Sequence, residues 1–174
     1  MNIQDEIKEN NIVLLVIPNE EYNDILIDTV KKIIDNEKIC YITLNKGYDA
    51  SIIFLKKNKI KTDNFFFIDS ITQTVKQQKD TKDCIFTSSP NALTELSVAI
   101  SKVAKNQKSK FIIFDSLSTL LIYHKDDIAT KFVKSLINKF ETTETNLVFT
   151  ITTKDKESIL FKNLQMSVNK VINL

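Results

Sequence analysis

The sequence is poorest in the residues that proteins use to hold phosphate. Of its 174 residues, one is glycine, Gly47, and none is arginine or tryptophan. A Walker A loop and a dinucleotide fingerprint each need several glycines, because backbone N–H groups must approach the phosphate closely. Without arginine there is no arginine finger and no bidentate clamp on phosphate or guanine. The usual tools of phosphoryl transfer and of base reading are therefore excluded.

Neither sign of charge dominates. The 24 lysines and 22 acidic residues give a net charge of +2 and are interleaved along the whole length. No block of basic residues indicates a nucleic-acid partner, so nucleic-acid binding is unsupported. The lysine-only basic set, with 25 isoleucines and 16 asparagines, is more typical of AT-rich coding than of a function. The one short cluster, Lys56, Lys57, Lys59 and Lys61, is predicted to be the solvated C-terminal turn of a helix.

Long apolar runs and clusters of metal ligands are also missing. No stretch approaches the roughly 18 apolar residues of a membrane span, and the N-terminal MNIQDEIKENN is polar and acidic. We expect a cytoplasmic protein without a membrane partner. Cys40 and Cys84 lie in or beside apolar runs, which favours buried reduced thiols. His124 is the sole histidine and is predicted to lie in a loop, so no metal site is assigned.

What is present is an ordinary globular mix, 43% apolar and 26% charged, of a length that suits one domain over residues 1–174. Short runs rich in isoleucine, valine and phenylalanine predict strands at 11–17, 38–44, 64–71, 84–87, 110–115, 146–152 and 169–174. Helical patterns alternate with them at 20–35, 48–57, 90–106, 126–140 and 155–164. This alternation is typical of βαβ units. The sequence predicts a three-layer α/β fold with a mostly parallel central sheet of about seven strands.

In an open parallel sheet, ligands bind at the carboxyl ends of the strands. Candidate site residues are therefore those that follow each strand. They are Pro18 to Tyr22, Asn45 to Tyr48, Asp69 and Ser70, Ser88 and Ser89, Asp115 and Ser116, and Thr152 to Lys154.

The segment FIIFDSLSTLLIY, residues 111–123, resembles the Walker B strand and its continuation in the RecA-like ATPases of the KaiC and RadA type, especially the archaeal ones. Four further segments support the resemblance, in order along the chain: SPNALTELSVAISKV, the helix 126–140, NLVFTIT and the closing NKVINL. The resemblance spans about residues 11–174. It implies a RecA-like, P-loop-NTPase-type fold, and it gives Asp115 the position of the aspartate that holds a magnesium-bound water.

Two departures from the family pattern concern catalysis. After the first strand the family has a glycine-rich loop that closes with Gly-Lys-Thr, whereas this chain reads Pro18-Asn19-Glu20-Glu21-Tyr22-Asn23. After the second strand the family has a catalytic glutamate, whereas this chain reads Leu44-Asn45-Lys46, and an amide cannot act as that base. No catalytic residue is therefore assigned and no cofactor is expected.

The remaining candidates have ordinary structural interpretations. Asp115 is favoured as a buried strand-end aspartate that bonds to the following backbone or to Ser116, and Asp69 is interpreted in the same way. Lys46 and Lys154 are interpreted as solvated loop lysines. Tyr22 and Tyr48 could flank a pocket but fit helix packing equally well.

These observations favour a non-catalytic RecA/KaiC-like domain, a pseudo-ATPase that acts as a regulatory or assembly module through protein contacts, self-association included. One alternative is a KaiC/RadA-type ATPase that binds ATP and magnesium at a rebuilt site of Asp115, Asn45 and Lys46. Another is a CheY-like receiver. The receiver is disfavoured because the first strand ends in Ile17-Pro18-Asn19 instead of an acidic pair, and because the chain is about 50 residues too long.

Overall fold

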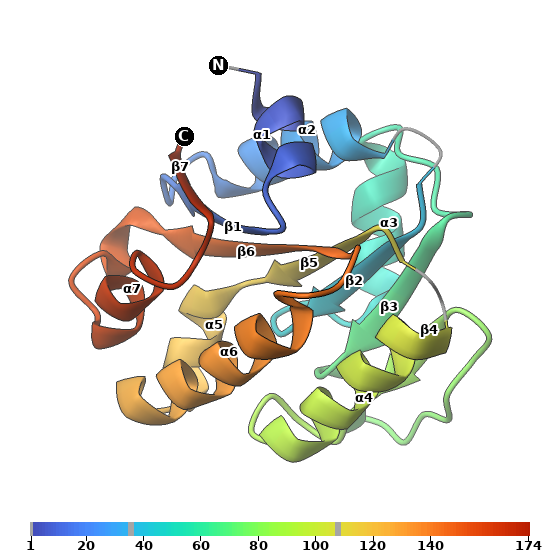
Figure 1. The fold of residues 1–174 in the computed structure, drawn as a ribbon. Coiled ribbons are helices and arrows are strands. Elements are labelled where there is room, and N and C mark those ends of the chain that lie inside the picture. Colours follow the sequence, from blue (N-terminus) through green and yellow to red (C-terminus); the bar gives the residue numbers. More distant parts are fainter. Residues whose placement is uncertain (1, 35–36, 107–108) are drawn as a thin grey trace.

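A seven-stranded parallel sheet forms the centre of the molecule in a computed structural model, which describes residues 2–34, 37–106 and 109–174 (Figure 1). Its strands are β1 (Ile12–Ile17), β2 (Ile39–Thr43), β3 (Phe65–Asp69), β4 (Cys84–Phe86), β5 (Phe111–Asp115), β6 (Asn146–Thr152) and β7 (Lys170–Asn173). Every pairing is parallel, in the order β4-β3-β2-β5-β6-β1-β7. Each predicted strand is present, which confirms the α/β fold class.

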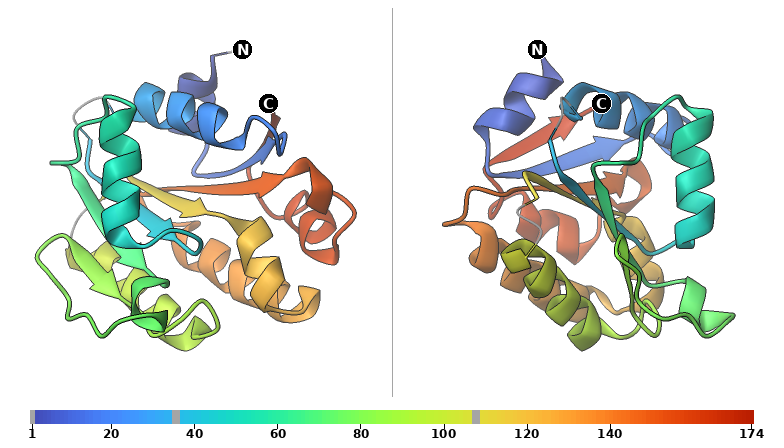
Figure 2. Two further views of the ribbon diagram at one scale, coloured as in Figure 1. Left: turned by 180° about the vertical axis from the view of Figure 1, so that it is seen from behind. Right: turned by 90° about the vertical axis from the view of Figure 1, so that its right-hand side faces the viewer.

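Helices cover both faces of the sheet, as the two further views in Figure 2 show. The helices are α1 (Ile3–Glu9), α2 (Tyr22–Ile33), α3 (Tyr48–Lys57), α4 (Leu93–Asn106), α5 (Leu117–Tyr123), α6 (Asp126–Phe140) and α7 (Ile159–Leu164), with short 3-10 turns at Thr72–Thr74 (η1) and Thr153–Asp155 (η2). Helices α1 to α3 pack on one face and α4 to α7 on the other. Because both faces are covered, the inner strands are buried along nearly their whole length instead of alternating between buried and exposed residues.

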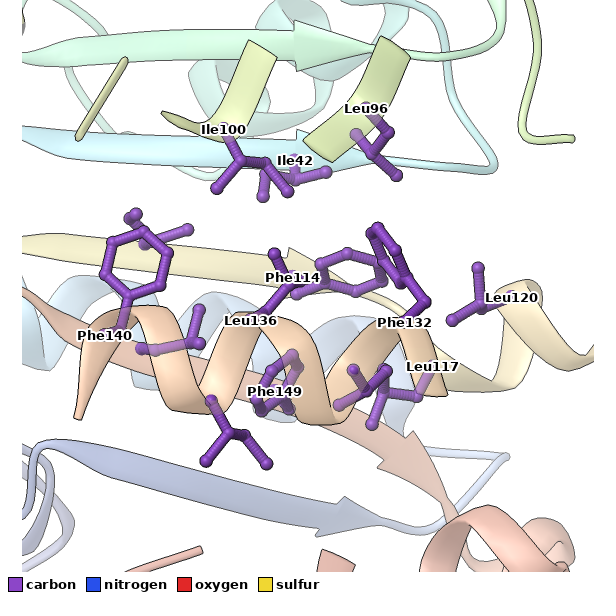
Figure 3. Packing of buried hydrophobic residues seen from close by; sticks show 14 of the residues in the cluster. Ile42, Leu96, Ile100, Phe114, Leu117, Leu120, Phe132, Leu136, Phe140 and Phe149 are labelled. Carbon is purple, nitrogen blue, oxygen red and sulfur yellow. The ribbon is translucent and has the colours of Figure 1, made fainter. Parts of the chain in front are cut away.

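The larger core lies between the sheet and α6 (Figure 3). Phe132, Leu136 and Phe140 recur at helical spacing and face the sheet. The ring of Phe114 in β5 lies 6.3 Å from that of Phe132 and 5.8 Å from that of Phe149 in β6. This packing fixes β5, and with it the strand end that carries the site.

Three helix predictions need correction. The helix predicted from residue 20 begins at Tyr22, because the N–H groups of Glu21 and Tyr22 bond back to the carbonyls of Pro18 and Asn19. Its predicted end at residue 35 lies outside the described residues. The helix predicted from residue 90 begins at Leu93, after a turn, and the helix predicted over 155–164 begins at Ile159, where the hydroxyl of Ser158 accepts the N–H of Phe161. Helices α1 and α5 were not predicted at all, although Asn2 caps the N-terminus of α1.

Two other expectations can be compared with the structure. His124 lies just beyond the end of α5, as predicted for a loop residue, and its Nε2 is 3.0 Å from the carbonyl oxygen of Pro90. Over the described residues, no helix has both the length and the apolar character needed to cross a membrane.

Candidate functional site

Asp115 lies at the carboxyl end of the central strand β5, between β2 and β6, and is only 1% exposed. The short connection from β1 to α2 passes the same edge of the sheet, because parallel strands end together. This arrangement brings the start of α2 close to the carboxylate. The Asp115–Ser116 peptide bond is cis.

Two tyrosine hydroxyls donate hydrogen bonds to the Asp115 carboxylate. Tyr22, the first residue of α2, donates to Oδ1 at 2.6 Å, and Tyr41, in the middle of β2, donates to Oδ2 at 2.5 Å. The sequence had favoured a buried aspartate bonded to the backbone or to Ser116, so its burial is confirmed and those partners were wrong. Ser116 instead caps α5, where its Oγ accepts the N–H of Thr119 at 3.2 Å.

The hydroxyl network continues into β6. The Tyr22 hydroxyl lies 2.6 Å from Oγ1 of Thr150, which is itself 3.0 Å from the carbonyl oxygen of Phe114. Each hydroxyl has one proton, so while Tyr22 donates to Asp115, the hydroxyl of Thr150 can donate to the carbonyl oxygen of Phe114 or to Tyr22, but not to both at once. The network therefore places Thr150 of β6 beside the Tyr22–Asp115 pair.

The environment keeps both tyrosines protonated. Burial raises the pKa of Tyr22 and of Tyr41 well above the usual value, and the neighbouring charge of Asp115 raises each further, because a phenolate would face a carboxylate. Both groups are therefore hydrogen-bond donors over the ordinary pH range. Two neutral phenol donors therefore stabilise the buried carboxylate of Asp115, which forms no ion pair with a side chain among the described residues.

The connection between β1 and α2 is too short to surround a phosphate. It consists of four residues, Pro18 to Glu21, and two N–H groups are used in its own turn. A Walker A loop spans eight residues and directs several free N–H groups at the ligand. Here Glu20 and Glu21 are exposed just before α2, where their carboxylates oppose an anion.

Asn45 and Lys46 follow β2, next to Asp115, but their side chains lie apart from it. The ammonium of Lys46 is 3.3 Å from Oδ1 of Asn23 and 4.7 Å from the centre of the Phe54 ring, and Asn45 is exposed. Within the described part of the chain, no hydrogen bond joins Asp115 to either residue. The three residues of the rebuilt-site alternative thus share one edge without forming a contact network.

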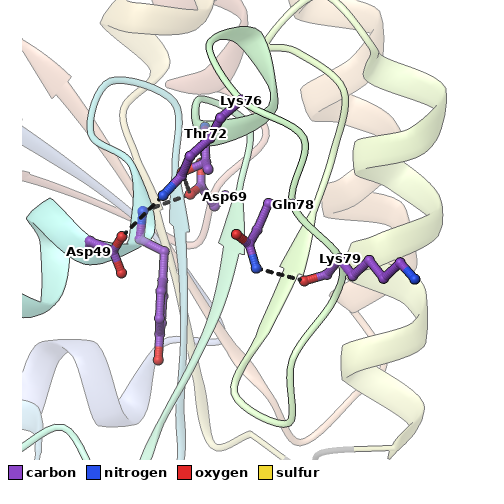
Figure 4. A network of polar contacts seen from close by, with 7 residues as sticks. Asp49, Asp69, Thr72, Lys76, Gln78 and Lys79 are labelled. Atoms are coloured by element: carbon purple, nitrogen blue, oxygen red, sulfur yellow. Dashed lines mark hydrogen bonds and ion pairs between the residues drawn. The ribbon is translucent and has the colours of Figure 1, made fainter.

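Asp69, at the end of β3, is a structural carboxylate, as the sequence suggested (Figure 4). Its Oδ1 accepts the N–H groups of Ile71 and Thr72, and its Oδ2 accepts the N–H of Tyr48 and the hydroxyl of Thr72. One side chain therefore caps both α3 and η1. The single glycine belongs to this junction, because a Cβ at Gly47 would lie 2.8 Å from Oγ1 of Thr72.

The other predicted candidates are placed as follows. The Tyr48 ring packs edge-on against Phe67 at 5.2 Å and also lines a small cavity of about 160 Å³, so both interpretations of this residue hold. Ser88 bonds through its N–H and its hydroxyl to the Glu95 carboxylate. Lys154 is exposed in η2.

The two cysteines agree with the sequence-based interpretation. Cys40 and Cys84 are free thiols in the core, and burial raises the pKa of each. Among the residues with described positions, no group of three or more metal-ligating side chains occurs.

Tyr41 is the site residue that sequence reasoning missed. It lies in the strand ICYIT, whose five residues are all buried. The available signal was its hydroxyl, because a phenol inside an apolar strand needs a hydrogen-bond partner. That partner is 74 positions away in sequence, so no local pattern could name it.

Comparison with known proteins supports the fold. No family model matches the sequence, and no curated protein does. Among solved structures, a KaiC-like protein from the hyperthermophilic archaeon Pyrococcus horikoshii matches with a TM-score of 0.58 and 12% identity, over 94% of this chain and 71% of that chain.

The sheet order decides between the fold alternatives. The receiver alternative is wrong, because a receiver has strand order 2-1-3-4-5, whereas β1 here lies between β6 and β7. At 12% identity the likeness to the archaeal protein concerns the fold alone. The chain is an α/β protein with a seven-stranded parallel sheet and a KaiC-like RecA fold.

Proposed function

We propose that this chain is a non-catalytic, KaiC/RecA-like domain, a pseudo-ATPase that acts as a regulatory or assembly module through protein contacts. The observation that carries the proposal is the hydrogen bond from Tyr22 to Asp115. In the family that the sequence resembles, the aspartate at this position holds a magnesium-bound water. Here a phenol at the start of α2 occupies that carboxylate.

Opening the site would cost more than a weak ligand could supply. A hydrogen bond to a charged group contributes about 1.5–3 kcal/mol, so freeing Oδ1 from Tyr22 would weaken a metal-dependent ligand by roughly 10- to 150-fold. Freeing Oδ2 from Tyr41 as well would multiply that penalty. The carboxylate is therefore available to a metal only at the expense of the fold around it.

The phosphate side of the site is also unfavourable. A carboxylate about 6 Å from a phosphate charge costs roughly 3 kcal/mol at an effective dielectric of 20 before screening, and the value in solvent is a fraction of this. Glu20 and Glu21 both precede α2. No loop lysine or arginine compensates, since Lys46 contacts Asn23 and Phe54 instead.

A scaffold with a closed site can still act through its surface. Several large apolar side chains are exposed, among them Ile122 at 78%, Ile128 at 44% and Ile159 at 57%. The carboxylate of Asp126 accepts the N–H of Ile159, so the starts of α6 and α7 lie together. Exposed apolar side chains near such a junction, here Ile128 of α6 and Ile159 of α7, are typical of surfaces that bind other proteins.

Calorimetric titration with ATP, ADP and GTP, with and without magnesium, tests the proposal. We expect no binding heat and no thermal shift at millimolar nucleotide. Micromolar binding that Asp115→Ala abolishes would overturn the proposal in favour of the rebuilt site. In that case Lys46→Ala should weaken binding, while the control Lys154→Ala, at an exposed position near the same edge, should not.

A further inference from the structure

The two edges of the sheet differ in how their outward backbone groups are satisfied. Along a parallel strand, alternate residues bond to one neighbour, and the residues between them point the other way. At one edge, the backbone groups of Asp83 and Thr87 bond to β3, through the N–H of Phe67 and the carbonyl of Asp69. The backbone groups of Cys84 and Phe86 in β4, which alternate with them, therefore face outward. At the other edge, β7 pairs with β1 alone among the described residues (Figure 1).

The β4 edge is capped by the polar segment that precedes it. The N–H of Phe86 donates to the carboxylate of Asp80 at 2.9 Å, and its carbonyl accepts from the amide of Gln73 at 3.4 Å. The carbonyl of Cys84 accepts the N–H of Thr81 at 2.9 Å. Three of the four outward groups of β4 are therefore occupied, which is a usual protection against edge-to-edge pairing.

In the part of the chain that the structure describes, no segment caps the β7 edge in this way. The N–H of Leu174 bonds to the carbonyl of Val16 at 3.0 Å, and Ile172 is in register with Leu15. These bonds direct the backbones of Ile172 and Leu174 toward β1. The N–H and C=O groups of Val171 and Asn173 therefore face away from the sheet, and no group in residues 2–34, 37–106 or 109–174 bonds to them.

The side chains of β7 favour pairing instead of blocking it. Ile172 is 1% exposed, and Val171 packs against the core on the opposite face. The one charged residue of the strand, Lys170, forms an ion pair of 3.0 Å with Glu6 of α1, so its charge is already neutralised. The strand lacks proline, and its backbone is left as a template for another strand.

We propose that the β7 edge binds a second copy of this chain, through antiparallel pairing of the two β7 strands about a two-fold axis at Ile172. In that register Val171 lies opposite Asn173 of the second copy, and Asn173 lies opposite its Val171. Each pair exchanges two hydrogen bonds, because residues that face each other in a narrow antiparallel pair satisfy both of their backbone groups. All four outward groups of each β7 are then used.

Side-chain chemistry agrees with this register. Ile172 meets Ile172 of the second copy at the axis, which is a favourable cross-strand pair. Lys170 lies opposite Leu174 of the second copy, so the two lysines do not oppose each other. Because the same patch is used on both copies, the contact closes on itself and produces a dimer, not a filament. The shortness of β7, four residues, predicts a weak, concentration-dependent dimer.

Asn173→Pro tests the contact directly. Proline removes only the outward N–H of residue 173, because β1 bonds to the residues on either side of it. The matched control is Asn173→Ala, which changes the same exposed side chain and keeps the N–H. Sedimentation from about 10 µM to about 1 mM, without nucleotide, should show a dimer for the wild type and the control. Two lost hydrogen bonds should weaken the Asn173→Pro dimer about tenfold or more.

Hydrogen exchange gives a second measurement that needs no variant. At low concentration the amides of Val171 and Asn173 should exchange fast, while that of Ile172 is protected by β1. At concentrations where the dimer forms, the first two amides should become protected. The proposal is overturned if the wild type stays a monomer over the whole concentration range, or if Asn173→Pro associates as strongly as the wild type. It is also overturned if a dimer forms in which the amides of Val171 and Asn173 still exchange fast. The outcome does not depend on nucleotide binding, so its failure is distinguishable from that of the pseudo-ATPase proposal.

Discussion

Removing the Tyr41 hydroxyl tests whether Asp115 is a structural charge held by phenols. Tyr41→Phe deletes the 2.5 Å hydrogen bond to Oδ2 and leaves the ring, whose centre is 5.9 Å from that of Phe67, in place. A hydrogen bond to a buried charge contributes about 1.5–3 kcal/mol. We expect the free energy of unfolding at pH 7 to fall by that amount.

Replacing the carboxylate itself should have a smaller effect. In Asp115→Asn, the amide can accept from one hydroxyl and donate to the other, while the cost of burying a charge disappears. We expect its stability to remain within about 1 kcal/mol of the wild type. In that background Tyr41→Phe removes a neutral hydrogen bond, so it should cost only about 0.5–1.5 kcal/mol.

Urea unfolding of the four proteins in this cycle measures the coupling, with m-values unchanged. Tyr123→Phe, at a side chain 40% exposed, is the control and should shift stability by less than about 0.5 kcal/mol. The reasoning is refuted if Tyr41→Phe costs the same in both backgrounds, or if Asp115→Asn destabilises the protein more than Tyr41→Phe does.

Three further predictions follow from single contacts. Gly47→Ala should destabilise the protein by about 1–3 kcal/mol, because the new Cβ meets Oγ1 of Thr72, and calorimetry should show a much smaller cost in a Thr72→Ala background. Lys59 holds φ at 62° just beyond α3, where glycine is preferred. Lys59→Gly should therefore increase the free energy of unfolding by about 0.5–1 kcal/mol, seen as a higher urea midpoint. The raised pKa values of both cysteines and both site tyrosines mean that the folded state holds these protons more tightly, so the contribution of these four groups to stability should be constant below pH about 8.5 and fall above it, more steeply beyond about 10. Tyr41→Phe should reduce the slope above pH about 10 by up to about 1.4 kcal/mol per pH unit, and an unchanged slope would contradict the assignment.

The strands could be predicted because each is a short apolar run. Residues buried on both faces of a parallel sheet have no polar alternation, so NIVLLVI and FIIFD are visible without any tertiary information. Helix starts were less visible. The glutamates at positions 20 and 21 favour a helix N-terminus locally, but the turn closed by Pro18 delays α2 to Tyr22.

The partners of the site carboxylate could not be predicted. Asp115 is identifiable as a strand-end acid, yet its hydrogen bonds come from residues 93 and 74 positions away. Only the strand order, with β2 beside β5 and with β1, which leads into α2, just beyond β6, brings those residues to it. The capped β4 edge is a similar case, because Gln73 and Asp80 are ordinary polar residues until the chain folds back along the strand.

The short β1–α2 connection and the tyrosine at Asp115 are two parts of one structural solution. A buried carboxylate that forms no ion pair with a described side chain must gain hydrogen-bond donors, since an unpaired buried charge is far more costly than either protonation or pairing. Because only four residues separate β1 from α2, the first helical residue begins close enough to the sheet edge for its hydroxyl to contact both Asp115 and Thr150. A longer, glycine-rich loop would move that residue away and leave room for phosphate. The sequence feature that excludes a phosphate loop is therefore the same feature that supplies Asp115 with its donor.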